Sequence, residues 1–291
     1  MNAIESTNNK RFKKTLKYLI VSLLFSAVCT SLIILLPNEH IRHSITIITL
    51  NVAAASATIL GIIAVYRYRM IGSHGKSYLF LTLGITLWFC ADLNLLYSYF
   101  IDGIEEQKQV SLSDILWLSG YVFLSLHLIF VIRTIRISNI SKTITILLIF
   151  IIGFIIINLI HSTSFDLFLD NVERDAIEKE FGIINLIITL IYPILDLGLI
   201  IPSIIILVNL YHDYQHSLPW VLASLSLLFN AIGDNGYVND FIRGSTSLWV
   251  WDLLYINDFI IMSAAFYWYN KFHISDILKE NKNKDKNNKE I

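Results

Sequence analysis

Residues 183–209 have the sequence IINLIITLIYPILDLGLIIPSIIILVN. This stretch contains one charged residue, Asp196, and no lysine or arginine. A helix needs about 20 apolar residues, each rising about 1.5 Å, to cross the hydrocarbon core of a bilayer. The stretch therefore predicts a transmembrane helix, and Pro193 and Pro202 are expected to kink it.

The composition of the whole chain agrees with a lipid environment. Hydrophobic residues make up 55% of the 291 residues and charged residues only 15%, whereas soluble domains average about 25% charged residues. The formal net charge is -1, so no overall positive field attracts nucleic acid. The composition predicts an integral membrane protein and gives no support to nucleic-acid binding.

Eight apolar windows are long enough to span a membrane. Open sheet edges cannot lie in hydrocarbon, and the windows lack the alternation of barrel strands, so each is predicted to be a helix. The fold class expected is all-α, a polytopic membrane helix bundle of eight transmembrane helices. The predicted spans are 18–36, 44–66, 78–101, 113–132, 144–160, 183–209, 219–237 and 248–269.

The basic residues of the short loops predict the orientation. Cytoplasmic loops carry an excess of lysine and arginine, and here the amino end, the loops around Lys76 and Lys142 and the lysine-rich carboxyl end fall on one side of the predicted bundle. Both termini are therefore expected in the cytoplasm. Residues 1–17 form a basic cytoplasmic segment, and residues 273–291 are too polar to fold and are expected to be a disordered cytoplasmic tail.

The two halves of the chain resemble each other. Residues 113–121, SDILWLSGY, align with residues 251–259, WDLLYINDF, which places Asp114 on Asp252. Asp92 and Asp234 miss exact alignment by one residue, and a further alignment places Asn51 on Asp196. Because four spans is an even number, the pattern predicts a 4+4 parallel repeat about an axis along the membrane normal.

Several aspartates fall inside the predicted spans, where no lysine or arginine lies deep enough to pair with most of them. A charge at the bilayer centre costs ~2.5–3.5 kcal/mol on insertion scales. Protonated carboxyl groups, a water-filled cavity or a bound cation would each relieve this cost, and each would place the acids inside the bundle. The predicted ligand- or cation-binding residues are Asp92, Asp114, Asp196, Asp234, Asp252, Asp258, Asn51 and Tyr255.

Structural roles compete with ligand binding at these positions. Asp114, in a Ser111-x-x-Asp114 capping box, and Asp252 lie in the first turns of their predicted helices, where a carboxylate caps free N–H groups. For these two acids capping is favoured over ligand binding. The alternative for Asp92, Asp196 and Asp258 is a buried side-chain hydrogen bond, and the partners considered are Asn51, Asn94, Asn230 and Tyr192.

Patterns of known catalytic sites are absent from the sequence. His212 and His216 have the i, i+4 spacing of two metal ligands on one helix face, but they follow the sixth predicted span and are more typical of solvated histidines. No GxSxG, HExxH or P-loop pattern occurs, and no lysine lies within a span to form a retinal Schiff base. No cofactor is expected, and the sequence leaves an enzymatic activity open while favouring its absence.

Short polar and aromatic patterns resemble a known kind of membrane region. They are WFCAD at 88–92, SLSDILWLSGY at 111–121, YPILD at 192–196, Gly233-Asp234-x-x-Tyr237 and WDLLY at 251–255. This chain resembles, over about residues 44–270, the multi-helix membrane sensory regions that precede GGDEF diguanylate cyclase and histidine kinase domains. The resemblance implies a sensor whose attached cytoplasmic domain produces the output. Here no output domain follows the last predicted span, so a separate partner is expected to supply it.

Three functions remain open at this point. The first is a stand-alone sensor or ligand-binding module of the cell membrane, in contact with the lipid bilayer and a signalling partner; self-association is left open. The second is a secondary transporter or proton-coupled permease that uses the intramembrane aspartates, for which the repeated halves and the prolines of residues 183–209 argue. The third, an intramembrane metal-dependent hydrolase, is disfavoured because the predicted spans separate the histidines from the aspartates.

Overall fold

The computed structural model describes residues 2–68, 72–103, 111–135, 176–210, 214–242 and 249–273, and positions 142, 146, 148, 150 and 153. These residues are helical apart from short turns, and none of them belongs to a strand. The prediction of an all-α fold is confirmed for this part of the chain. The helices are α1 (Asn2–Ile34), α2 (Glu39–Tyr68), α3 (Gly72–Phe100), α4 (Leu112–Ile132), α6 (Ala176–Leu210), α7 (Tyr214–Ile242) and α8 (Trp249–Trp268), which continues into the π-helix η2 (Tyr269–His273).

Seven helices in the described part of the chain are long and apolar enough to cross a membrane. Each overlaps one of the predicted spans, and the prediction of a multi-pass membrane protein is confirmed. The remaining predicted span, 144–160, lies outside the described residues except at Ile146, Leu148, Phe150 and Gly153, which are helical. The histidine His212 and the tail from residue 274 onward also lie outside them.

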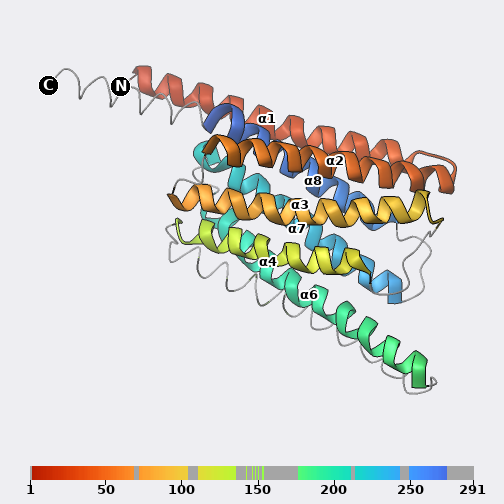
Figure 1. Cartoon of the computed structure of the whole chain (residues 1–291). Helices are drawn as coiled ribbons and strands as arrows, with labels where there is room; N and C mark the ends of the chain where they lie inside the picture. Colours follow the sequence, from red (N-terminus) through yellow and green to blue (C-terminus); the bar gives the residue numbers. More distant parts are fainter. Residues whose placement is uncertain are drawn as a thin grey trace.

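Six helices form a closed ring. Around the ring α2 contacts α3, α3 contacts α4, α4 contacts α6, α6 contacts α7, α7 contacts α8, and α8 returns to α2. Helix α1 lies outside the ring against α8, with most of its membrane-spanning residues exposed, and its amino-terminal end extends beyond the other helices (Figure 1). A ring of this kind gives the chain an interior that side chains from both halves of the sequence can share.

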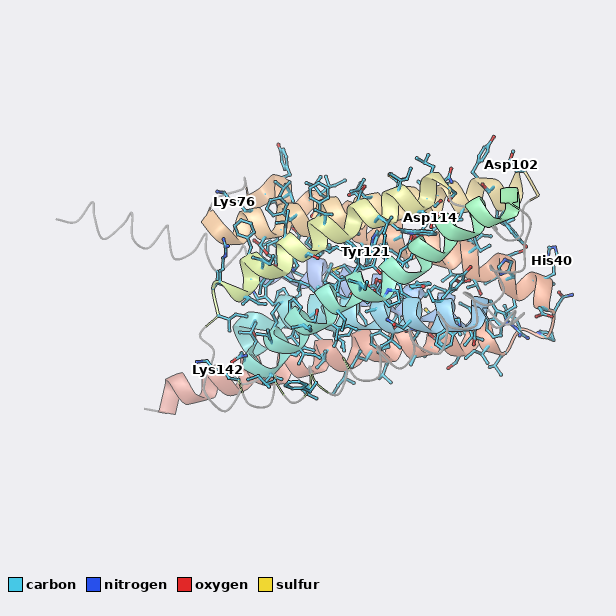
Figure 2. The ribbon with its side chains drawn as sticks, turned by 90° about the horizontal axis from the view of Figure 1, so that it is seen from below. His40, Lys76, Asp102, Asp114, Tyr121 and Lys142 are labelled. Atoms are coloured by element: carbon cyan, nitrogen blue, oxygen red, sulfur yellow. The ribbon has the colours of Figure 1, made fainter. Side chains whose placement is uncertain are left out.

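The two ends of the bundle carry different residues. Lys76 and Lys142 lie at one end, and His40 and Asp102 lie at the other (Figure 2). Helix α1 begins, and α8 with η2 ends, at the same end of the bundle (Figure 1). Asp114 lies toward the end of Asp102, and Tyr121 lies about midway along the bundle (Figure 2).

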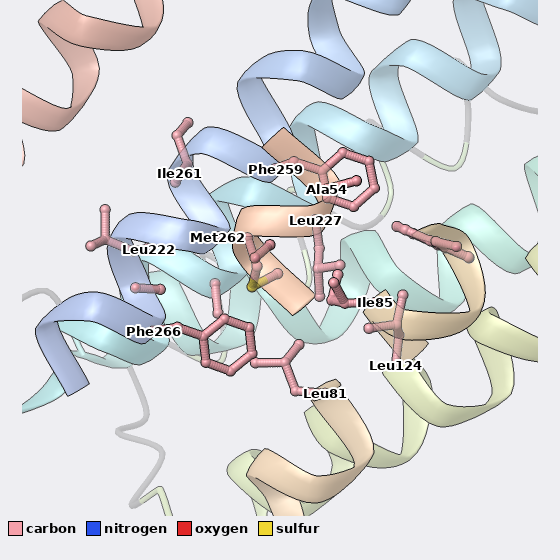
Figure 3. Packing of buried hydrophobic residues seen from close by; sticks show 14 of the residues in the cluster. Ala54, Leu81, Ile85, Leu124, Leu222, Leu227, Phe259, Ile261, Met262 and Phe266 are labelled. Atoms are coloured by element: carbon pink, nitrogen blue, oxygen red, sulfur yellow. The ribbon is translucent and has the colours of Figure 1, made fainter. Parts of the chain in front are cut away.

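An apolar cluster fills part of the bundle interior. Leu81, Ile85, Leu124, Met262 and Phe266 are all buried and come from α3, α4 and α8 (Figure 3). Polar side chains are buried near Lys76 as well, where the Ser77 hydroxyl bonds His127.

Helices α3 and α4 approach each other closely because glycines face each other at their crossing. A Cβ atom on Gly120 would lie 3.1 Å from the carbonyl oxygen of Gly84 and would collide with the Trp88 ring. Any larger side chain at Gly120 would therefore push the two helices apart.

Helix α6 contains both prolines in its interior. It continues through both Pro193 and Pro202 as one helix from Ala176 to Leu210, and its amino-terminal half lies at an angle to α4 (Figure 1). Each proline removes one backbone N–H from the helix ladder, yet neither ends the helix. Asp196, which lies between them, is held on a continuous helix that faces α4 and α7.

Candidate functional site

The centre of the candidate site is the hydroxyl group of Tyr121, which joins three helices. Tyr121 on α4 lies 2.6 Å from Asp196 Oδ1 on α6 and also contacts Asp234 Oδ2 on α7. Tyr121 is 1% exposed and Asp196 is 0% exposed. The two carboxyl groups are within hydrogen-bonding reach of each other. Sequence reasoning predicted both aspartates as site residues, and the structure places them in contact.

Two further donors complete this network. Asn235 on α7 donates its Nδ2–H to Asp196 Oδ2 at 2.8 Å, and Tyr255 on α8 donates its hydroxyl to Asp234 Oδ1 at 2.6 Å. Asp234, Asn235 and Tyr255 are half-buried. Residues Tyr121, Asp196, Asp234, Asn235 and Tyr255 are called the acidic network below. The network links α4 of the first half of the chain to α6, α7 and α8 of the second half.

Asp114 caps α4, the role that the sequence analysis favoured for it, and its side chain also bonds α6. Its Oδ2 accepts the Ser111 backbone N–H at 2.9 Å and the Ser111 hydroxyl at 3.1 Å, which confirms that it caps α4. Its Oδ1 accepts the Tyr192 hydroxyl of α6 at 3.1 Å. Asp114 therefore ties α4 to α6 about two helical turns from Tyr121.

Asp92 on α3 is held by Trp117 on α4. The indole N–H of Trp117 donates to Asp92 Oδ1 at 3.2 Å, and Asp92 is 5% exposed. In the second half, Tyr255 on α8 bonds Asp234 on α7 in the same way. The sequence alignment paired Trp117 with Tyr255 and placed Asp92 one residue from Asp234, so the two halves make equivalent contacts.

Asp258 on α8 is 0% exposed and lies against α7. The hydroxyl of Ser226 donates to its backbone oxygen at 3.0 Å and also contacts its Oδ1, and the Asn230 side chain lies within hydrogen-bonding reach of the carboxyl group. Ser226 corresponds to Gly84, because each lies eight residues before an aspartate, Asp234 or Asp92. Asp258 corresponds to Gly120, because each lies three residues after an aromatic residue, Tyr255 or Trp117. The close crossing of Gly84 and Gly120 is thus replaced in the second half by a polar contact.

The remaining predicted residues are placed differently. Asp252 on α8 is half-buried and interacts electrostatically with Asp92 and Tyr255. Asn51 on α2 is buried, but its side chain donates to the Ile47 carbonyl oxygen at 3.0 Å and makes no hydrogen bond to the acidic network. The structure therefore brings the six predicted aspartates and Tyr255 close enough to interact, while Asn51 makes no hydrogen bond to them.

His127 makes its hydrogen bonds away from the acidic network. It is bonded to the Ser77 hydroxyl at 2.8 Å. His212 lies outside the described residues, and the side chain of His216 is not among those described. No group of three metal-ligating side chains occurs in the described part of the chain, so the metal-dependent hydrolase hypothesis gains no support.

Sequence reasoning missed Tyr121, Asn235 and Ser226. Tyr121 follows Asp114 by seven residues, which is two helical turns, so the spacing alone puts both on one face of the helix. Ser226, Asn230 and Asp234 are spaced by four residues and also share one helix face. Asn235 carried no such signal, because adjacent residues on a helix point in different directions.

The chemistry of the acidic network is that of an acceptor-rich site. Its donors are two phenols and one amide, all neutral, and α4, α7 and the 191–210 part of α6 contain no lysine or arginine in the described spans. Carboxylate oxygens accept hydrogen bonds and bind cations. The site can therefore hold a proton, a cation or the donor groups of a ligand, and it has no group that would hold an anion.

Comparison with known proteins does not identify the chain. It matches no protein-family model, no curated protein and no solved structure.

Proposed function

We propose that the chain is a stand-alone membrane sensor, a ligand-binding module whose receiving site is the acidic network. One observation carries the proposal: a single hydroxyl group, that of Tyr121, bonds α4 to α6 and α7 at once. A ligand that changes the charge or the hydrogen bonding of Asp196 or Asp234 changes the bonds that hold these three helices together. The site is therefore suited to convert binding into a helix movement.

The ligand class follows from the acceptors that the site offers. Asp234 and Tyr255 retain accessible surface, whereas Asp196 and Tyr121 are enclosed, so a ligand would reach the network by way of Asp234. Such a ligand carries positive charge or hydrogen-bond donors. A ligand shifts the equilibrium between the helix arrangement with the Tyr121 bonds and one without them only by the difference in its affinity for the two. The ligand must therefore compete with Tyr121 or Tyr255 for a carboxyl group.

A thermal-shift experiment on the purified chain tests the proposal. Sodium, potassium, magnesium, calcium and cationic amphiphiles are added to the wild type, to Asp196→Asn and to Asp240→Asn. Asp240 accepts the Trp251 indole N–H at 2.8 Å outside the acidic network and is the matched control. We expect a ligand-dependent increase in the wild type and in Asp240→Asn that is lost in Asp196→Asn. No shift with any probe, together with no copurified small molecule, would contradict the proposal.

The proposed output is delivered to a separate cytoplasmic or membrane partner. The resemblance to sensory regions of diguanylate cyclases and histidine kinases motivates this part, and the helices available to transmit a movement are α4, α6 and α7. The test is to reconstitute the chain with a kinase or cyclase encoded beside its gene. A change in that enzyme's rate with the wild type, and not with Tyr121→Phe, is expected; an unchanged rate in both would argue against a signalling role.

We further propose eight spans in the cell membrane, with both termini in the cytoplasm and two parallel four-helix halves. Helix α4 ends at the Lys142 end of the bundle and α6 begins at the other end (Figures 1 and 2), so a crossing by residues 144–160 accounts for the path between them. The equivalent Trp117–Asp92 and Tyr255–Asp234 contacts support the repeat. In whole cells an impermeant thiol reagent is expected to label His40→Cys but not Lys76→Cys. The opposite pattern would reverse the orientation.

A secondary transporter or proton-coupled permease is the alternative. Two prolines flank Asp196, and proline-interrupted helices at corresponding places line the sites of many transporters. Proteoliposomes distinguish the two functions: a transporter gives a solute or proton flux that falls in Asp196→Asn, while a sensor gives none. A flux that is the same in both proteins would exclude a transport role for this aspartate.

A further inference from the structure

The acidic network has one hydrogen too few. Asn235 supplies an N–H to Asp196 Oδ2 and Tyr255 supplies an O–H to Asp234 Oδ1. The other two carboxyl oxygens, Asp196 Oδ1 and Asp234 Oδ2, both contact the hydroxyl of Tyr121. A phenol carries one hydrogen. Tyr121 can therefore donate to one of these oxygens, and the other contact lacks a hydrogen.

A proton on one of the two carboxyl groups completes the network. A carboxylic acid has an O–H group, and this group can donate to the Tyr121 oxygen while the Tyr121 hydrogen is donated to the second carboxylate. The chain then runs from Asp234 Oδ2–H to the Tyr121 oxygen, and from the Tyr121 O–H to Asp196 Oδ1, or in the reverse direction. Every close contact of the Tyr121 oxygen then has one hydrogen.

Among the described residues, no neighbour offers a positive charge to neutralise the network. Asp92 on α3 and Asp252 and Asp258 on α8 interact electrostatically with its members, and Asp114 on α4 interacts with Tyr192. The other titratable neighbours are the phenols of Tyr192 on α6 and Tyr237 on α7. All of these groups are acids, and none supplies positive charge. Two carboxyl groups that share one site retain a proton between them.

We propose that Asp196 and Asp234 share one bound proton through Tyr121, and that this proton is a ligand of the receiving site. Only the consequence, that loss of the proton acts as a signal, rests on the proposed function; the shared proton itself does not. When the proton leaves to water, two negative charges face each other and the Tyr121 hydrogen is retained by one carboxylate alone. Helix α4 then loses its bond to either α6 or α7, so an increase in pH loosens the network.

Isotope-edited infrared spectroscopy of the full chain in lipid nanodiscs tests the shared proton. Labelling with ¹³C-aspartate identifies the C=O stretch of a protonated aspartic acid, which moves in D₂O. We expect one component of this band in the wild type to be lost in either Asp196→Asn or Asp234→Asn alone, because the remaining carboxylate is satisfied by neutral donors, while a component from another buried aspartate is retained in both variants. The control Asp240→Asn keeps the band.

If no component of the band is lost in either variant, or if a component is lost in only one of them, the shared proton is wrong. The wild type gives a second test that needs no variant. A pH increase that removes the carboxylic acid band must shift a tyrosine ring mode in the same titration, because Tyr121 bonds both groups; a tyrosine spectrum that does not change contradicts the proposal.

The two proposals fail in different ways. If the infrared results are as expected but no pH change alters a partner's activity, the proton is bound and the sensor role is wrong. If a ligand binds in the thermal-shift experiment but no protonated aspartate depends on both Asp196 and Asp234, the sensor role stands and the shared proton is wrong.

Discussion

Replacing Tyr121 with phenylalanine removes the hydroxyl that connects α4 to α6 and α7 and leaves the ring in place. The ring is 1% exposed, and its centroid lies 5.3 Å from that of Trp88 and 6.1 Å from that of Tyr192. Phenylalanine can keep both aromatic contacts. The substitution therefore isolates the contribution of the hydroxyl group from that of side-chain packing.

The magnitude of this change depends on which kind of hydrogen bond the hydroxyl makes. Hydrogen bonds between membrane helices average about 0.6 kcal/mol and reach about 1.7 kcal/mol, whereas bonds to charged groups are worth about 1.5–3 kcal/mol. The Tyr121 hydroxyl contacts two carboxyl groups, and Asp196 is completely buried. Removing the hydroxyl leaves Asp196 Oδ1 without its donor, so we expect a loss near the upper range, about 2 kcal/mol.

The assay is the free energy of unfolding of the purified chain, measured by steric trapping in lipid bicelles. Tyr97→Phe is the matched control, because Tyr97 is 57% exposed and its hydroxyl is not enclosed by the bundle. We expect Tyr97→Phe to change the unfolding free energy by less than about 0.5 kcal/mol, as is usual for surface substitutions. If Tyr121→Phe were no more destabilising than Tyr97→Phe, the hydroxyl would not join the helices as described.

Three further predictions concern the packing around the acidic network. Gly120→Ala is expected to lower the unfolding free energy by about 1–3 kcal/mol, because the added Cβ atom would meet the Trp88 ring and the Gly84 carbonyl oxygen. Gly153→Ala is the control and should have no such cost, since no atom lies within 4 Å of the position of its Cβ atom. Ser226→Ala is expected to cost about 1–3 kcal/mol because Asp258 Oδ1 loses its donor, and Ser56→Ala, which removes a bond within an exposed turn of α2, should cost less; equal losses would contradict this role of Ser226. Asn257→Ala removes the bonds to Ser26 and Thr30 that hold α1 on α8. Amide hydrogen exchange in residues 18–34 should therefore accelerate, while exchange in α2 should not change. Unchanged exchange in α1 would refute this attachment.

The spans could be predicted from sequence because hydrophobic length is a local property. Residues 113–132 and α4 (Leu112–Ile132) differ by one residue at the start. Residues 183–209 were predicted as one helix, and α6 is one helix through both prolines. The contacts that satisfy the backbone groups freed by the prolines come from neighbouring helices and could not be predicted.

The members of the site could be predicted only in part. An aspartate inside a span must face the interior, so the cost of burial predicted Asp92, Asp196 and Asp258. The partners of these acids depend on the rotation and pairing of helices that are distant in the sequence. Asp196 therefore meets Tyr121 and Asn235 rather than the amides considered from sequence, and Asn51, which aligns with Asp196, bonds its own helix instead.

The most direct test of the acidic network is a double-mutant cycle between Asp196→Asn on α6 and Asp234→Asn on α7, read as the free energy of unfolding. Residues in contact or in one hydrogen-bond network couple by about 0.5–3 kcal/mol, and distant residues add to within about 0.3–0.5 kcal/mol. The account predicts a coupling of at least about 1 kcal/mol for Asp196 and Asp234, and none for Asp196 and Asp240. Additive effects at Asp196 and Asp234 would contradict a shared network.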